Sequence, residues 1–171
     1  MTCDREDFRA VRATRINHVS ISATDLEEST RFYEGLFGME RLPTAKFSQP
    51  VQWLRLGDQQ LHLFERKGTE APRYHHLGLD VDDFDAVYLK AKELGLLDRG
   101  TWDHPLRVHP SGWVQMYIRD PAGNLVEIDW PDASTLDPAL AAELHPLEAD
   151  APQTGDAADA TLYHQGVRSP A

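Results

Sequence analysis

The stretch Ile16-Asn17-His18-Val19-Ser20-Ile21-Ser22 alternates apolar and polar residues and is followed at Thr24 by a helical pattern. The same arrangement returns as Tyr74-His75-His76-Leu77-Gly78-Leu79-Asp80, which is followed by a helical pattern at Asp82. Alternation is typical of a strand with one face on a core. Repetition at a fixed distance indicates two similar units. The sequence therefore predicts two copies of one strand–helix motif.

Each copy ends in a short strand that carries one polar residue between apolar neighbours. The first of these strands is Leu61-His62-Leu63-Phe64 and the second is Val126-Glu127-Ile128. His18 and His76 are 76 − 18 = 58 positions apart, and His62 and Glu127 are 127 − 62 = 65 apart. The repeat thus gives equivalent positions to His18, His62, His76 and Glu127, which are our candidate metal ligands.

Length and composition exclude several classes of protein. The 171 residues are 41% hydrophobic, which is enough for one domain with a real core. The formal charge is −11 and only four lysines are present, so we expect no nucleic-acid partner. No apolar run approaches a membrane span and the first residues are too charged for a signal peptide, so we expect no membrane partner and a cytoplasmic protein. Cys3 is the single cysteine, which rules out a thiolate metal cage.

Apolar periodicity divides the chain into four parts. We expect a leader over residues 1–14, a first module over 15–70, a second module over 71–132 and an acidic tail rich in Ala and Pro over 133–171. A capping box from Thr24 to Glu27 begins the first helix. The apolar side of the second helix is expected to consist of Phe84, Val87, Leu89 and Leu94.

Three segments outside the repeated motif also have expected structures. We expect His104–Gly112 to be a loop over the mouth of a cavity, because it is bounded by Pro and rich in hydrogen-bond donors. The composition of the tail predicts a short helix over Pro138–Leu144 and a linker over residues 148–160. Thr161–His164 is expected to be a docking element.

Side-chain parity tests whether the four candidate ligands can share one surface. In each strand the apolar neighbours at odd offset point toward the helices, which leaves His18, His62, His76 and Glu127 on the opposite face. The same parity selects His76 over His75. Each residue alone fits a solvated face, but their recurrence in both copies favours a shared metal site. Imidazole and carboxylate ligands without sulfur suit a divalent Zn, Ni, Fe(II), Mn or Co cofactor.

Four segments together resemble the vicinal oxygen chelate superfamily, which includes glyoxalase I, bleomycin-resistance proteins and extradiol dioxygenases. They are Ile16–Val19, Phe32–Met39, His75–Val81 and Asp120–Glu127, and the resemblance covers residues 15–130. It implies an α+β fold of two tandem βαβββ modules with curled mixed sheets around a central metal-binding cavity. It also implies that His18, His76 and Glu127 are ligands, whereas His62 stands where glyoxalase I has Glu.

Further residues share the parity of the candidate ligands or lie in the expected mouth loop. Tyr117 could donate a hydrogen bond to a developing oxyanion, and Glu127 or His62 could move a proton. For the others a cavity wall and a solvated face stay open as alternatives. The expected substrate-binding residues are Trp53, Arg55, Phe64, Gln115, Arg107 and His109.

The ligand set and the resemblance leave three functions open. The leading hypothesis is a glyoxalase-like lyase or isomerase, in which a divalent metal chelates vicinal oxygens of a small substrate and stabilises an enolate. The second is an Fe(II) extradiol-type ring-cleaving dioxygenase, with His62 as a base outside the metal sphere. The third is a metal-free protein that binds a small molecule or antibiotic. We expect a small-molecule substrate and a homodimer, with the site formed within one chain or across two.

Overall fold

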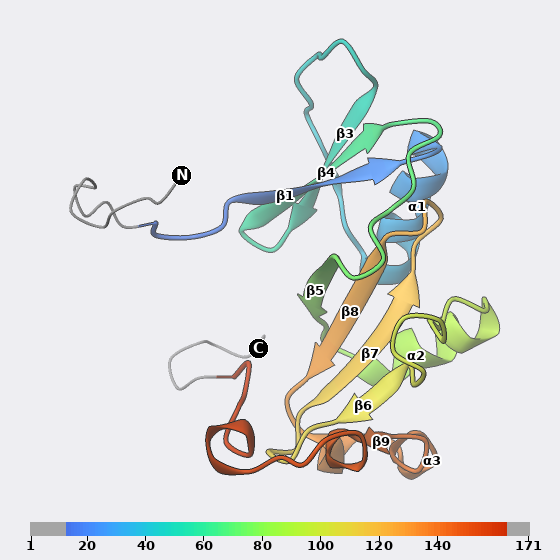
Figure 1. Ribbon diagram of the computed structural model, residues 1–171. Coiled ribbons are helices and arrows are strands. Elements are labelled where there is room, and N and C mark those ends of the chain that lie inside the picture. The colour runs from blue at the N-terminus through green and yellow to red at the C-terminus, as the bar shows by residue number, and fades with distance from the viewer. Residues whose placement is uncertain (1–12, 164–171) are drawn as a thin grey trace.

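The computed structural model describes residues 13–163. Its strands form two separate sheets, which lie one above the other in Figure 1. The strand order is β1-β4-β3-β2 in the first sheet and β5-β8-β7-β6-β9 in the second. Each sheet mixes parallel and antiparallel pairs, as predicted for this fold class. Most of the expected leader and His164 of the expected docking element lie outside the described residues.

The first sheet is built from residues 18–65 and is covered by one helix. Its strands are β1 (His18–Ala23), β2 (Arg41–Leu42), β3 (Val51–Leu56) and β4 (Gln59–Glu65), and α1 (Leu26–Phe37) follows β1. The N-cap of α1 is Asp25 and not Thr24, because the strand extends to Ala23 and the Asp25 side chain accepts a hydrogen bond from the Glu28 N–H at 2.9 Å.

The second sheet repeats this order with β5 (His76–Asp80), α2 (Phe84–Glu93), β6 (Leu106–Val108), β7 (Val114–Arg119) and β8 (Leu125–Trp130). The prediction of a loop over residues 104–112 is wrong at its centre, because β6 pairs there with β7.

The apolar face of α2 differs from the predicted one. Leu89 and Leu94, which were predicted to belong to it, are 64% and 53% exposed. Tyr88 and Ala91 are buried instead, and with Phe84 and Val87 they complete a helical apolar stripe.

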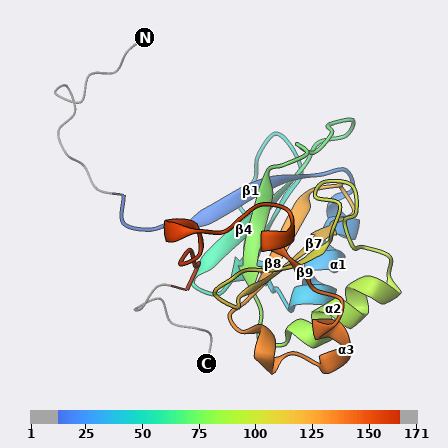
Figure 2. The same ribbon diagram turned by 60° about the horizontal axis from the view of Figure 1, so that its bottom comes forward.

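The tail adds a strand and then returns to the second sheet. It contains η2 (Ala133–Thr135), α3 (Pro138–Ala141), β9 (His145–Pro146), η3 (Leu147–Ala149) and η4 (Gly155–Ala157). β9 is parallel to β6. The linker expected over residues 148–160 is held to the second module at its last residue, because the Ser111 hydroxyl and the Trp113 indole both donate to the Ala160 carbonyl, at 2.9 and 3.2 Å. Figure 2 shows the tail wrapping away from α3 along the second sheet.

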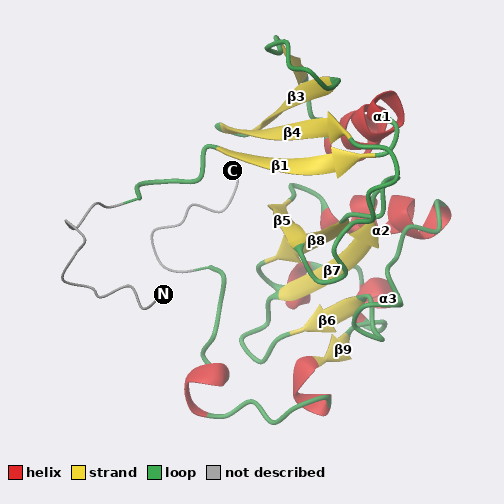
Figure 3. Ribbon diagram, turned by 45° about the horizontal axis from the view of Figure 1, so that its top comes forward, coloured by secondary structure: helices red, strands yellow, loops and turns green. Residues whose placement is uncertain are grey.

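The core lies on the helix side of both sheets. Figure 3 shows α1 and α2 on one side of the strands and the last described residues of the tail on the other. Two hydrogen bonds connect the modules: the Tyr33 hydroxyl donates to Asp120 at 3.0 Å, and the Asn124 amide donates to the Ser22 carbonyl at 2.8 Å. Over residues 13–163 we find no helix with the length and apolar character needed to cross a membrane.

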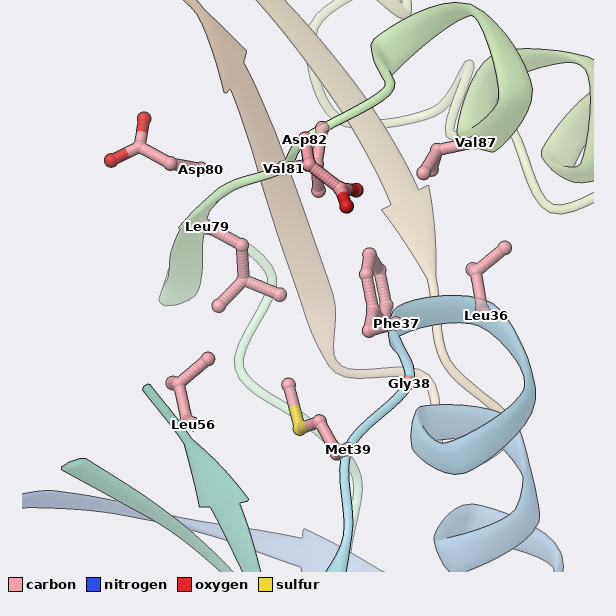
Figure 4. Close-up of a pocket in the computed structure, with 10 residues that line it drawn as sticks. All are labelled: Leu36, Phe37, Gly38, Met39, Leu56, Leu79, Asp80, Val81, Asp82 and Val87. Atoms are coloured by element: carbon pink, nitrogen blue, oxygen red, sulfur yellow. The ribbon is translucent and has the colours of Figure 1, made fainter. Parts of the chain in front are cut away.

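A cavity of about 400 Å³ lies where the end of α1 meets β5 (Figure 4). Its wall is mostly apolar, with Phe37 and Met39 on one side and Leu79 on the other. The carboxylate of Asp80 points away from these side chains in Figure 4, as expected for the neighbour of Leu79 in a strand. The polar face of the second sheet is therefore separate from this apolar cavity.

Candidate metal centre

The strand register places the four candidate ligands in two equivalent pairs. In the first sheet Ser20 is paired with His62, and His18 comes two residues before Ser20. In the second sheet Gly78 is paired with Glu127, and His76 comes two residues before Gly78. Each sheet therefore presents one pair, carried by two neighbouring parallel strands.

The first pair, His18 and His62, consists of stacked imidazoles with ring centroids 4.3 Å apart. His18 Nδ1 lies 2.6 Å from Asn17 Oδ1, and His62 Nε2 lies 2.8 Å from Gln60 Oε1. Because an amide oxygen can only accept, these two ring nitrogens carry the proton and donate it. The lone pairs of His18 Nε2 and His62 Nδ1 are left for another partner.

The second pair, His76 and Glu127, has its ligand atoms facing each other. His76 Nδ1 donates to the Tyr74 carbonyl at 3.0 Å, so its Nε2 keeps a lone pair. That Nε2 lies 3.4 Å from Glu127 Oε2. Two atoms that each bind a metal ion at about 2.1 Å are separated by roughly 3.0–3.4 Å. The pair therefore fits one metal ion.

The chain does not bring the two pairs together. Among residues 13–163 no three His, Cys, Asp or Glu side chains are arranged to hold a metal ion. The two pairs lie on different sheets. Side-chain parity decides which residues share a face of one sheet, but it does not bring residues of two sheets together. The four candidate ligands therefore do not form one site within residues 13–163.

Burial affects the protonation of His62. Its side chain is largely buried, whereas that of His18 is exposed. Burial, with a smaller effect of the neighbouring His18, lowers the pKa of His62 below its usual value. The imidazole therefore stays neutral to lower pH, and the neutral form is the one that binds metal.

Two buried groups surround Glu127, which is itself only 5% exposed. Tyr117 is directly opposite on β7, and burial and a hydrogen bond to Glu127 raise the pKa of Tyr117 far above its usual range. Asp129 follows on the same face of β8, and burial and the charge of Glu127 raise the pKa of Asp129 to about 8. Asp129 was not among the predicted site residues, although its parity is that of Glu127.

The substrate-binding residues predicted in the first module lie in two different surroundings. Trp53 stacks on His62 with ring centroids 4.6 Å apart, and Phe64 lies edge-on to Phe47. Trp53 therefore continues the stacked rings of the first pair. Arg55 is instead exposed and forms an ion pair with Glu40 at 3.2 Å.

The residues predicted in the second module are largely engaged with one another or with the tail. Arg107 donates to Asp150 at 2.5 Å and to the Trp102 carbonyl at 2.7 Å. His109 Nε2 lies 2.7 Å from Gln115 Oε1. Arg107 thus anchors the tail through η3, which ends next to Asp150.

A pocket of about 340 Å³ lies over the second pair. The tail contributes Leu162 and Tyr163 to its wall, and the Tyr163 hydroxyl donates to Asp80 at 2.8 Å. This part of the expected docking element therefore docks beside the candidate ligands. Neither Tyr163 nor Asp80 was predicted as a site residue. The pocket is lined by His76, Gly78, Asp80, Glu127, Asp129, Leu162 and Tyr163.

Comparison with known proteins identifies relatives of the repeated region. The chain is 26% identical to human mitochondrial methylmalonyl-CoA epimerase over 131 residues, covering 67% of this chain and 73% of the epimerase. It is 31% identical to the metallothiol transferase FosB of Lysinibacillus sphaericus over 124 residues, covering 66% of this chain and 79% of that protein.

Solved structures share the fold. Lactoylglutathione lyase from Agrobacterium tumefaciens has a TM-score of 0.54 at 24% identity, covering 69% of this chain and 94% of the lyase. Another similar structure is a mutant of the fosfomycin resistance protein FosX from Listeria monocytogenes, in complex with Mn(II) and 1S,2S-dihydroxypropylphosphonic acid. It has a TM-score of 0.58 at 16% identity, covering 68% of this chain and 92% of FosX. The sequence profile of one family matches residues 15–128. The chain belongs to the Glyoxalase/Bleomycin resistance protein/Dioxygenase superfamily.

Proposed function

We propose that this protein is a metal-dependent enzyme of the lyase or isomerase type, with His18, His62, His76 and Glu127 as ligands of one divalent metal. The observation that carries the proposal is the hydrogen bonding of the histidines. Each of the three has one ring nitrogen that donates to an oxygen acceptor, which leaves the lone pair of the other ring nitrogen available to a metal ion. Ligand histidines in metal sites are oriented in this way. The Mn(II) in the FosX complex also supports a divalent metal.

The residues around Glu127 are suited to proton transfer. A bound divalent metal would supply a Lewis acid that polarises substrate oxygens. Glu127 is buried beside Tyr117, so its carboxylate can accept a proton in a site that excludes most water. Tyr117 keeps its own proton at neutral pH, as an ordinary tyrosine does, and burial raises its pKa further, so its hydroxyl can donate a hydrogen bond to negative charge that develops on the substrate.

We also propose that the two ligand pairs meet between two copies of the chain. The pairs lie on different sheets, and within residues 13–163 they do not converge. His18 and His76 are both exposed, as ligands that await a partner surface should be. In a twofold homodimer the first pair of one copy would face the second pair of the other, and two identical sites would form.

One observation favours the Fe(II) dioxygenase as a second candidate. His62 is more buried than His18, its pKa is lowered, and its Nδ1 is free. A neutral imidazole of this kind could act as a base beside a triad of His18, His76 and Glu127. The two candidates therefore differ in the role of His62.

His62→Ala separates the two functions. If His62 is a ligand, we expect metal retention after dialysis to fall by about tenfold or more, as in His18→Ala. If it is a base outside the metal sphere, metal content should stay at the parent level while turnover of a catechol panel under air is lost. Metal content by elemental analysis, hemithioacetal isomerisation and catechol turnover are measured on each variant. His75→Ala is the control and should retain metal. Full metal retention in His62→Ala would contradict direct ligation.

A further inference from the structure

The tail crosses the face of the second sheet that carries candidate metal ligands. The part of the chain that matches the family ends at residue 128, and the described chain continues to residue 163. In Figure 3 the last described residues lie on the side of the strands opposite α1 and α2. The second ligand pair, His76 and Glu127, shares a pocket with these residues. The tail is therefore an addition to the family region that reaches the candidate site.

The tail is firmly attached at its base. β9 is parallel to β6 and extends the sheet by one strand. The Asp150 carboxylate accepts a hydrogen bond from Arg107 at 2.5 Å and lies 2.7 Å from His145 Nε2. The Arg107 side chain is only 13% exposed, so its ion pair is better shielded from water than a surface pair. We expect this base to stay in place when the rest of the tail moves.

Residues 152–158, which we call the hinge, are weakly attached. Most of them are exposed. Within the described part of the chain they form hydrogen bonds only with one another or with Ala151. These bonds run from the Gln153 amide to the Ala151 carbonyl and from the Ala158 N–H to the Gly155 carbonyl, both at 2.9 Å. Segments with so few contacts open locally at low cost in free energy.

After the hinge, the segment Ala160–Tyr163, which we call the strap, returns to the sheet. The Ala160 carbonyl accepts two side-chain hydrogen bonds from the segment before β7. The Tyr163 hydroxyl donates to Asp80 at 2.8 Å. Hydrogen bonds from uncharged donors make a modest net contribution to stability, and Leu162 stays 49% exposed. The strap can therefore lift while the base remains on the sheet.

The strap lies over the second ligand pair. Leu162 and Tyr163 form part of the wall of the pocket of about 340 Å³ that also contains His76 and Glu127. Glu127 is only 5% exposed. In the proposed shared site, the first pair of another copy has to reach the metal ion held by this second pair. The strap and the other copy would therefore compete for the same surface.

We propose that Ala160–Tyr163 is an autoinhibitory strap, closed over the second ligand pair in this structure and lifted when another copy of the chain binds there. The hinge permits the movement and the base on β6 limits it. Closure reduces the fraction of chains that can bind, so it lowers the apparent affinity for metal and for the other copy. The inhibition rests on the proposed function, whereas closure over Glu127 does not.

Substitutions of Tyr163 in the full chain test closure. Tyr163→Phe removes the hydrogen bond to Asp80, and Tyr163→Asp places a second carboxylate beside Asp80 and should repel the strap. Carbodiimide coupling of glycine ethyl ester to Glu127, located by tandem mass spectrometry on metal-free protein, reports opening. We expect its rate to rise about threefold in Tyr163→Phe and about tenfold or more in Tyr163→Asp. Thr154→Asp is the matched control, because it adds the same charge to the exposed hinge, and it should react as the parent does.

The sites of coupling decide whether the strap closes over the pair. An unchanged rate at Glu127 in both Tyr163 variants would overturn the inference, and so would an equal rise in Thr154→Asp. Asp120 is buried and bonded to the Tyr33 hydroxyl, away from the strap. A parallel rise at Asp120 would indicate general unfolding and would also overturn the inference.

Mn²⁺ titration of the same variants decides whether closure inhibits. Tyr163→Asp should bind Mn²⁺ about threefold or more tightly than the parent, because the cost of opening is removed. Unchanged Mn²⁺ affinity in a variant with increased coupling at Glu127 would show that the strap does not inhibit. Absence of Mn²⁺ binding in the parent and in every variant would instead contradict the proposed function, while the coupling rates would still decide closure.

Discussion

The candidate ligand histidines depend on neighbouring acceptors that fix their rings. Asn17 and Gln60 supply side-chain oxygens for His18 and His62, and the Tyr74 carbonyl does the same for His76. Such a contact fixes which nitrogen carries the proton and raises the basicity of the other. The ability of the site to hold metal should therefore be sensitive to residues that never touch the ion.

Gln60→Ala tests this dependence. Loss of the acceptor frees the His62 ring to rotate and to exchange tautomers, and we expect metal affinity to fall by about 10- to 100-fold. Competition with a chromophoric chelator measures the affinity. Gln59→Ala is the control, because Gln59 precedes Gln60 and points to the opposite face of β4. Unchanged affinity in Gln60→Ala would show that the acceptor does not orient a ligand.

Strand alternation could predict that the four candidate ligands share a sheet face in each module, because parity is a local property of the chain. His18, His62, His76 and Glu127 accordingly occur in equivalent register positions. Asp129 could have been found by the same rule, since it lies two residues after Glu127. Tyr163 could be anticipated only as part of a docking element, because its place beside Asp80 depends on the path of the whole tail.

Among the elements, the edge of the second sheet depends on short strands and on one buried ion pair. β6 and β9 have three and two residues and no apolar period, so the sequence could not predict them. They form because β7 offers an edge with unpaired backbone groups. Nearby, Arg119 Nε donates to Asp98 at 3.1 Å, which fixes the segment after α2 against β7.

Asp98→Asn should reduce stability in a pH-dependent way. Burial alone would raise the pKa of Asp98, but hydrogen bonds from Thr101 and the Arg119 guanidinium outweigh it and lower the pKa below its usual value. The folded protein then binds fewer protons than the unfolded chain. The stabilisation is complete above about pH 4 and is lost as pH falls through the folded-state pKa.

Urea denaturation at pH 7 and pH 3 measures this effect. At pH 7 we expect Asp98→Asn to lower the free energy of unfolding by about 2 kcal/mol, and at pH 3 the difference from the parent should shrink. Asp58→Asn is the control, because its ion pair with Arg15 is exposed and should contribute within about 0.5 kcal/mol. A loss that stays the same at both pH values would contradict the assigned ionisation.

At the scale of the whole molecule, the proposed four-ligand site depends on how the two sheets are arranged. The two modules are joined by few contacts, among them the Tyr33–Asp120 and Asn124–Ser22 hydrogen bonds. Neither bond brings the ligand pairs together. The sequence predicts each module from local patterns but contains no comparable signal for the surface between two copies. The assembly therefore has to be measured.

Two double variants test the shared metal site most directly. One carries His18→Ala with His62→Ala, and the other carries His76→Ala with Glu127→Gln. Each alone should bind no Mn²⁺, because every site lacks one pair. In mixed dimers made by co-expression, one of the two sites regains all four native ligands, so bound Mn²⁺ should return to about half the parent level. Mixed dimers without Mn²⁺, or parent-level Mn²⁺ in either double variant alone, would contradict a four-residue site shared between two copies.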